Sequence, residues 1–379
     1  MVGLTDDACI EFYKHNDMHI LTLRWRAPLQ ATGYSTEIKW VFMKIKYYII
    51  RRLILLIPVL IGVSVITFFL THLAGDPISA WVTPKTPLSM YPLIREQHHL
   101  NDPILVQYIY YVNDLLHFNL GLSASEGGRP VASALADYFP ATAELTIAAM
   151  ILMPLIGIPI GIISAIRKDR IEDHIVRIFS LCGVSIPIFW FALILQYVFY
   201  LKLGWLPLGG RLPITMMSPH RVTGLYTVDS LLAGQYDTFV QAVIHLILPA
   251  FCLAFSSLAV ISRLIRSSML EVMTQDFIQT ARAKGLSERV VISKHALRNA
   301  LIPTTTMLGL ALAGLLSGAV LIETIFMWPG IGRYSTKAIT SNDFASIMGF
   351  TLLVVIVFVL VNLAVDILYA YIDPRVKYR

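Results

Sequence analysis

Six long windows without a charged side chain constrain the fold of this chain more than any other feature of its sequence. The windows are 53–71, 145–166, 178–201, 242–262, 301–322 and 345–365. A helix needs roughly 20 residues to cross the hydrocarbon core of a bilayer, which is about 30 Å thick. Because backbone amides in hydrocarbon must be hydrogen-bonded within the protein, the windows predict an all-α polytopic membrane protein with six transmembrane helices.

The composition and the prolines of the windows fit this prediction. Only 14% of the residues are charged and 56% are hydrophobic, whereas a soluble domain carries roughly 25% charged residues. Prolines lie inside several windows, at Pro58, Pro154, Pro159, Pro187 and Pro249. We interpret them as kinks in continuing helices, because membrane helices tolerate proline.

The distribution of Lys and Arg sets the expected orientation. From residue 43 onward, 18 of them lie before the first window, between the second and third, between the fourth and fifth, and after the sixth. The other side holds 8, spread over longer loops. The positive-inside rule therefore predicts a cell-membrane protein with both termini in the cytoplasm. Since this bias explains the net charge of +6, we expect no nucleic-acid partner.

The chain is expected to divide into four segments. Residues 1–42 contain no long apolar run, and a basic patch starting at Met43 leads into the first window. We expect 1–42 to be an N-terminal extension, either disordered or an artefact of an upstream start site. Residues 43–139 would form the first transmembrane helix and an external cap segment, with a helix near 104–116. Residues 140–372 would form the core with five transmembrane helices, and 373–379 a cytoplasmic tail.

The loop 263–300, between the fourth and fifth windows, is far longer than a turn requires. Its central sequence is QTARAKGLSERVVISKHALRNALIP, residues 279–303. Gly285 suits the left-handed C-terminal cap of a helix, and Ser287 can cap a second helix. Ala281 and Gly285 stand four residues apart, on one small face that lets a partner approach closely. From these residues alone, the loop is either a docking surface or a surface hairpin made basic by the orientation rule.

The motifs of this loop resemble the EAA coupling loop of ABC-transporter permeases, in the branch that serves dipeptides, oligopeptides and nickel. The stretch Thr280–Gly285 is TARAKG and Arg298–Pro303 is RNALIP, as is typical of this branch. The generic motif begins with Glu and Ala, where this chain has Gln279 and Thr280. The resemblance covers nearly all of 43–379, with further motifs GDP at 75–77, LNDP at 100–103, NLG at 119–121 and WPGIG at 328–332.

The resemblance implies half of a type I importer, in which two homologous permease subunits form the pore and two ATPase subunits bind below. A soluble binding protein outside the membrane delivers the substrate. The residues expected to contact the ATPase are Phe277, Thr280, Ala281, Arg282, Lys284, Gly285 and Leu286. The sequence has no Gly-x4-Gly-Lys-Ser/Thr motif, so we expect the partner to use the ATP and this chain to bind no cofactor.

The expected function is that of a non-catalytic permease subunit for peptides. Import of oligosaccharides or nickel by the same machinery stays an alternative, and an ion-coupled secondary transporter is the alternative from another class. Glu144, His245 and Glu323 lie near the outer ends of windows and are candidates for the substrate path. The two glutamates would meet either a cationic substrate or an arginine of the external loops. No grouping of residues predicts a metal site or a catalytic centre.

Overall fold

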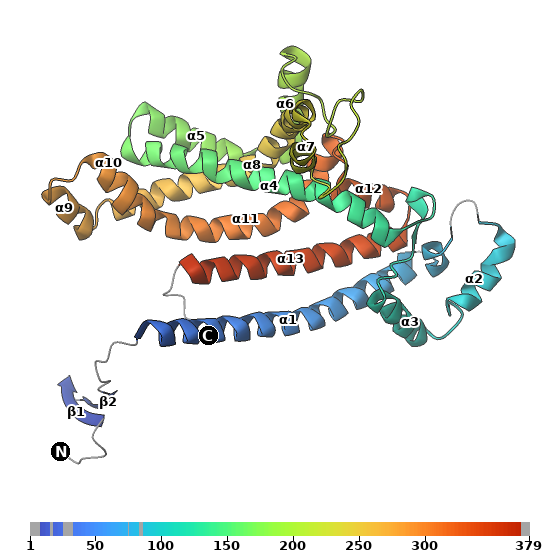
Figure 1. Cartoon of the computed structure of the whole chain (residues 1–379), viewed down its shortest axis with the longest axis horizontal. Coiled ribbons are helices and arrows are strands. Elements are labelled where there is room, and N and C mark those ends of the chain that lie inside the picture. The colour runs from blue at the N-terminus through green and yellow to red at the C-terminus, as the bar shows by residue number, and fades with distance from the viewer. Residues whose placement is uncertain (1–7, 16–17, 26–32, 75, 83–85, 373–379) are drawn as a thin grey trace. The chain divides into compact units, whose positions relative to one another are not determined.

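The computed structural model describes residues 8–15, 18–25, 33–74, 76–82 and 86–372 (Figure 1). The chain separates into two compact units, one of Met1–Arg52 with Tyr378–Arg379 and one of Leu53–Lys377. The cytoplasmic tail predicted at 373–379 lies outside the described residues. The unit Leu53–Lys377 includes the boundary expected after residue 139, and the division into a cap segment and a core of five helices stays a prediction.

The first unit contains a two-stranded hairpin. Strand β1 (Ala8–His15) pairs antiparallel with β2 (Met18–Trp25), with Ala8 opposite Trp25. Helix α1 (Gly33–Ala74) begins in this unit and continues into the second, so it crosses the expected boundary at residue 42. Residues 1–42, which were expected to be disordered or an artefact of an upstream start site, include β1, β2 and the beginning of α1. Whether translation starts before residue 43 stays a prediction.

Short elements connect α1 to the long helices of the second unit. They are η1 (Pro77–Ala80), η2 (Leu88–Met90), α2 (Tyr91–Gln97), α3 (Ile104–Leu116), β3 (Leu122–Ser123), η3 (Ala124–Glu126) and β4 (Arg129–Pro130). The bounds of α3 match the helix expected near 104–116. Side chains join α3 to α1: the hydroxyls of Ser64 and Tyr108 lie 2.9 Å apart, and the ring of Phe68 packs edge-on against that of Tyr108.

Three long helices form the centre of the second unit: α4 (Val131–Ile166), α8 (Tyr236–Val272) and α11 (Leu297–Ile325). Figure 1 shows them side by side, and α8 contacts both of the others. Helix α4 approaches α8 closely through Gly157 and Gly161. A Cβ atom at Gly161 would lie 2.6 Å from the carbonyl oxygen of Ser262. This small-xxx-small spacing is how membrane helices bring their backbones together.

The third apolar window does not form one helix, which corrects the prediction of a continuous span at 178–201. Helix α5 (Ile171–Ser185) ends before Pro187, and α6 (Ile188–Leu195) with the π-helical segment η4 (Gln196–Lys202) leaves at an angle of 112°. Ile186 has φ −79° and ψ 125°, an extended conformation. A residue before proline avoids the helical region, so Pro187 breaks this span instead of kinking it.

The other prolines lie inside continuous helices, as predicted: Pro58 in α1, Pro154 and Pro159 in α4, and Pro249 in α8. The remaining elements of the unit are α7 (Tyr226–Leu232), α9 (Asp276–Ala283), α10 (Glu288–Val290), η5 (Val291–Ala296), α12 (Ile331–Thr340) and α13 (Phe344–Ile372).

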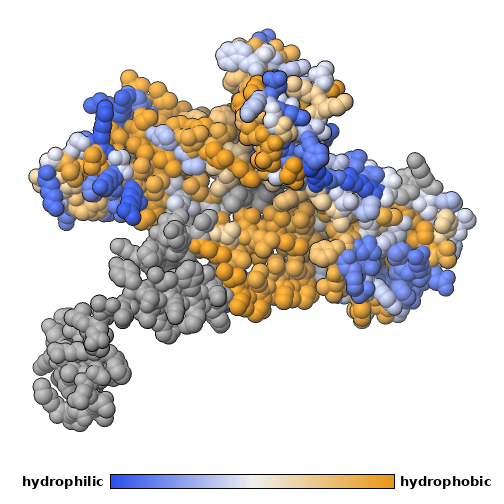
Figure 2. Space-filling model, in the orientation of Figure 1, coloured by the Kyte–Doolittle hydropathy of each residue, from blue (hydrophilic) through white to orange (hydrophobic). Residues whose placement is uncertain are grey.

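The protein is a mostly helical, multi-pass membrane protein. Within the described residues, four helices are long and apolar enough to cross a membrane: Ile49–Leu70, Val131–Ile166, Tyr236–Val272 and Phe344–Val365. The bent pair α5 and α6 would add a fifth span, and α11 contains the window 301–322. Figure 2 shows hydrophobic residues over the long helices and hydrophilic residues gathered at the ends. The count of six spans stays a prediction.

Candidate functional site

The expected coupling loop consists of α9, a glycine turn and a second helical segment. Helix α9 ends at Ala283, and Gly285 has φ +75°, which confirms the predicted left-handed conformation. Ser287 precedes α10, but its side chain forms no capping hydrogen bond, so that part of the expectation is wrong. From α10 the chain continues through η5 into α11. The loop is therefore attached directly to a long helix of the bundle.

Helix α9 turns its apolar face toward its own chain. Ile278 is fully buried and Ala281 is 5% exposed, and both belong to the same hydrophobic core as Val291. The expectation that Ala281 and Gly285 share an open small face is therefore wrong for Ala281. The other six expected contact residues are exposed: Phe277, Thr280, Arg282, Lys284, Gly285 and Leu286. Their contact with an ATPase stays a prediction, and Ala281 anchors the helix that carries them.

An ion pair spans the glycine turn between α9 and α10. Arg282 Nε donates to Glu288 Oε1 at 2.7 Å, and Nη2 lies 3.4 Å from Oε2. The side chains are 38% and 59% exposed. An exposed pair of this kind contributes between about 0 and 1 kcal/mol to stability. The pair links α9 to α10 across the glycine turn.

A buried carboxylate holds together the helices at this end of the bundle. Asp173 of α5 is fully buried and accepts hydrogen bonds from Arg266 Nε at 2.6 Å and Nη2 at 2.9 Å. The hydroxyl of Ser164 on α4 donates to it at 2.6 Å. Helices α4, α5 and α8 therefore meet at Asp173. Arg266 lies on the final turns of α8, which lead toward α9. From the sequence, Arg266 contributes only to the positive-inside bias, because nothing in the sequence links two residues so far apart.

At the opposite end of α11, Glu323 is fully buried and joins three segments. Its Oε1 accepts from the Thr142 hydroxyl on α4 at 2.6 Å, and its Oε2 accepts from the backbone N–H of Arg333 on α12 at 2.9 Å. The backbone N–H of Ile331 donates to the Thr142 hydroxyl at 2.9 Å. A carboxylate at a helix N-terminus is favoured because the unpaired N–H groups and the helix dipole point toward it.

Glycine is required beside this carboxylate. A Cβ atom at Gly330 would overlap both the carboxylate of Glu323 and the hydroxyl of Thr142. The neighbouring Trp328 is 1% exposed, and its indole N–H donates to the carbonyl of Ala141 at 2.7 Å. The WPGIG motif at 328–332 therefore packs its backbone directly onto α4 and the end of α11. The motif could be seen in the sequence, but its partner Thr142 could not.

Glu144, the second substrate-path candidate, is paired with Arg211, an arginine of the loop between η4 and α7. Arg211 Nη2 donates to Glu144 Oε2 at 2.6 Å, and both side chains are buried. Thr227 donates to Oε1 from its backbone N–H and its hydroxyl, at 2.7 and 2.8 Å. The Arg211 guanidinium also lies 3.5 Å from the ring centre of Tyr226. Of the two expectations for Glu144, the structure contains the contact with a loop arginine.

The three candidates do not form one site. His245 is 6% exposed, and its Nδ1 donates to the carbonyl of Gln241 on the same helix at 2.8 Å. Glu144 belongs to α4 and is paired with Arg211, whereas Glu323 belongs to α11 and is bonded to Thr142. All three side chains are therefore held by neighbours within the chain, and a role for them in the substrate path stays a prediction.

Comparisons with known proteins give a consistent result. The model of the family described as "Binding-protein-dependent transport system inner membrane component" matches residues 157–378. A probable D,D-dipeptide transport system permease protein of Escherichia coli K12 is 48% identical, over 85% of this chain and 94% of the relative. A dipeptide transport system permease protein of Alkalihalophilus pseudofirmus is 46% identical, over 87% and 99%.

An oligopeptide transport system permease protein of Bacillus subtilis is 38% identical, over 87% of this chain and 99% of the relative. Among solved structures, an inward-facing conformation of the MetNI methionine ABC transporter matches with a TM-score of 0.44 and 18% identity. That match covers 62% of this chain and 93% of the other.

Proposed function

The chain belongs to the family of binding-protein-dependent transport system inner membrane components, and we propose that it forms half of the translocation pore of an ATP-driven peptide importer. One observation carries the choice of cargo: the relative with 48% identity over 85% of this chain is named for dipeptide transport. The two other curated relatives described above are named for dipeptides and oligopeptides. These names favour peptides over oligosaccharides or nickel.

The energy source in this proposal is a pair of ATPase subunits on the cytoplasmic side. The sequence contains no phosphate-binding loop of the Gly-x4-Gly-Lys-Ser/Thr type, which is what an ATPase of this kind uses to hold ATP. The exposed residues of α9 and its glycine turn are the proposed contact, with Phe277 and Leu286 offering apolar side chains that are 39% and 40% exposed. A homologous permease subunit would complete the pore.

In this proposal the binding protein docks at the membrane face opposite the ATPases. The charge bias favours both termini in the cytoplasm. The segments α2, α3 and 203–235, together with α12, would then lie outside. In this arrangement the peptide is released by the binding protein onto the side that carries Glu323 and the WPGIG motif.

The packing suggests how a movement of the ATPase reaches the pore. Ile278 and Ala281 pack with Val291, which lies in the segment that continues into α11. Helix α11 has 29 residues, or about 44 Å at 1.5 Å per residue. At its far end Glu323 is bonded to α4 and α12. A displacement of α9 would therefore move a rigid rod whose other end holds the outer segment, which is a two-state element biased from another chain.

The proposal is tested by reconstituting the chain with its second permease, ATPases and binding protein in liposomes and measuring uptake of a radiolabelled dipeptide. ATP-dependent uptake is expected, with nickel and an oligosaccharide failing to compete. Uptake of nickel or sugar without dipeptide would reject the cargo, and uptake driven by an ion gradient without ATP would reject the mechanism.

The contact surface has its own test, the substitution Gly285→Val. Valine at φ +75° is strained, so the turn and α9 should move. We expect uptake per ATP hydrolysed to fall by about tenfold or more. Gly234→Val is the matched control, because Gly234 also has positive φ and open space around it but lies in an external segment. Equal effects of the two substitutions would argue against a coupling role for the turn.

A further inference from the structure

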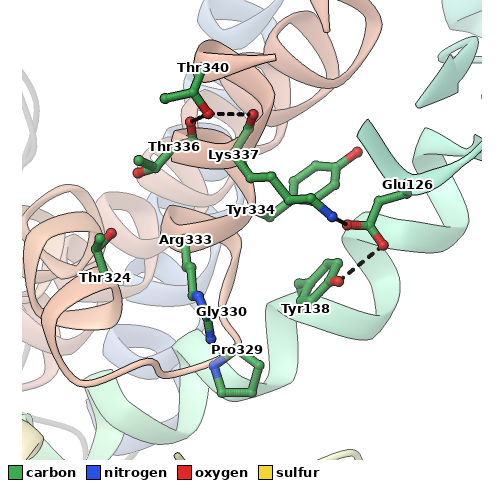
Figure 3. Close-up of a pocket in the computed structure, with 10 residues that line it drawn as sticks. All are labelled: Glu126, Tyr138, Thr324, Pro329, Gly330, Arg333, Tyr334, Thr336, Lys337 and Thr340. Carbon is green, nitrogen blue, oxygen red and sulfur yellow. Dashed lines mark hydrogen bonds and ion pairs between the residues drawn. The ribbon is translucent and has the colours of Figure 1, made fainter. Parts of the chain in front are cut away.

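A cavity of about 450 Å³ lies where α12 faces the start of α4 and the β3–β4 turn (Figure 3). Its walls also include the end of α11 and the turn before α12. The lining residues are Glu126, Tyr138, Thr324, Pro329, Gly330, Arg333, Tyr334, Thr336, Lys337 and Thr340. Its volume falls in the range of about 300 to 1,000 Å³ that is usual for small-molecule sites. None of its ionisable residues was a candidate from the sequence.

Two buried carboxylates fix the walls of this cavity. Glu323 holds the backbone of Arg333, as described above. Asp343 is fully buried and accepts from the hydroxyl of Ser123 at 2.8 Å and from the backbone N–H of Ser125 at 2.9 Å. It also accepts from the hydroxyl of Ser346 at 2.7 Å, which ties the β3–β4 turn to the start of α13. The cavity is therefore preformed, and a ligand would not have to order it.

The side chains that line the cavity include two cations, Arg333 and Lys337, and one carboxylate, Glu126. Lys337 Nζ donates to Glu126 Oε1 at 2.6 Å, and this bond raises the pKa of Lys337. Glu126 also lies within reach of the Tyr138 hydroxyl, which donates to Oε2 at 3.3 Å. The single carboxylate of the lining is thus occupied by one lysine and one tyrosine. One cation of the lining, Arg333, is left over.

Arg333 has donors to spare. A guanidinium carries five N–H donors, and Arg333 Nη1 donates to the carbonyl of Met327 at 2.9 Å. Among the described residues, no carboxylate forms an ion pair with its side chain. Figure 3 shows Arg333 and the Lys337–Glu126 pair on different sides of the space they line. Since arginine binds carboxylates in a bidentate manner, an anionic ligand would complete this arrangement.

We propose that this cavity binds the C-terminal carboxylate of a short peptide, with Arg333 as its direct ligand. This inference rests on the proposed function, because it assigns the substrate a first contact on the outer side of the pore. The rings of Tyr138 and Tyr334, stacked with centroids 5.2 Å apart, offer an apolar wall for a peptide side chain. The other source of the same chemistry is an acidic side chain of the binding protein, and the experiment separates the two.

The experiment uses the complete permease–ATPase complex in lipid nanodiscs, without ATP and without the binding protein. Dialanine and dialanine amide are titrated and their binding is followed by saturation-transfer NMR. Dialanine is expected to bind about tenfold more tightly than the amide, since a hydrogen bond to a charged group contributes enough for such a ratio. Equal binding of the two, or no binding of dialanine, overturns the proposal.

Variants of Arg333 test whether this residue causes the preference for the free carboxylate. Arg333→Gln should abolish the preference for the free carboxylate, whereas Arg333→Lys should keep part of it. Lys202→Gln removes an exposed cation outside the cavity and should leave binding unchanged. A carboxylate preference that survives Arg333→Gln overturns the assignment. The binding protein is then titrated onto the same complexes in a separate measurement, and weaker docking in Arg333→Gln with unchanged dialanine binding would also overturn the assignment. Failure of the proposed function is distinguishable, because it would appear as absent dipeptide uptake by the wild-type complex.

Discussion

The charged residues near the two ends of α11 are held by different kinds of contact. At the end near α9, the buried Asp173 of α5 is bonded to the guanidinium of Arg266 as well as to the Ser164 hydroxyl and the backbone N–H of Asp169. The exposed pair of Arg282 and Glu288 spans the turn there. At the far end, Glu323 is bonded to a hydroxyl and to the backbone N–H of Arg333. Contacts between side chains can be re-formed with other rotamers, whereas contacts to backbone in a glycine cradle require one geometry. We infer that the exposed side-chain contacts at the first end can rearrange against a partner, whereas α11, α4 and α12 stay joined at the far end and move together.

The largest effect is expected at the far end, from Gly330→Val. The new side chain would overlap Glu323 and Thr142, and the backbone of the WPGIG motif cannot yield because Trp328 is buried behind it. We expect a loss of about 3 kcal/mol of stability, seen as a lower melting temperature or a lost complex in detergent. Gly62→Ala, at a helical glycine with open space around it, is the control. Tolerance of Gly330→Val would mean that this end is not rigid.

Asp173→Asn is expected to lower the free energy of unfolding by an intermediate amount. The substitution leaves Arg266, which is 19% exposed, without its carboxylate. Breaking a buried pair costs about 3 kcal/mol or more, and the partial exposure of Arg266 reduces this to roughly 2 kcal/mol. The double variant Asp173→Asn with Arg266→Gln should recover part of the loss in a double-mutant cycle. Strictly additive losses would show that the two residues do not act as a pair.

The smallest effect is expected from Arg282→Gln. Because both partners of this ion pair are exposed, the melting temperature should change by an amount equivalent to less than about 1 kcal/mol. The stimulation of ATPase activity by substrate-loaded binding protein should change more than the stability does. A large loss of stability with intact coupling would place the pair in the fold and remove it from the adaptable end.

The elements that the sequence predicted are those specified by local patterns. The apolar windows, the helix at Ile104–Leu116 and the left-handed Gly285 depend on residues next to one another in the chain. Pro154, Pro159 and Pro249 stay inside helices while Pro187 ends one. The same residue type had both outcomes, so the presence of a proline did not by itself predict where a span is broken.

The parts of the site that sequence reasoning missed all involve distant partners. Ala281 is buried because Val291 packs with it, which depends on how the chain folds back after the glycine turn. Thr142 and Glu323 are 181 residues apart, and Asp173 and Arg266 are 93 apart. For Glu144, reasoning from the sequence left two partners open, and the loop arginine is the one present. A buried acid indicates that a partner exists, but only the fold identifies it.

The glycine contact between α4 and α8 also limits where a solute can travel. At Gly161 the neighbouring backbone and side chains lie so near that a single methyl group would collide with Ser262 and Ile265. No water-filled passage, and so no peptide, can run along this seam. In the proposed importer, the peptide would therefore pass along another face of these helices.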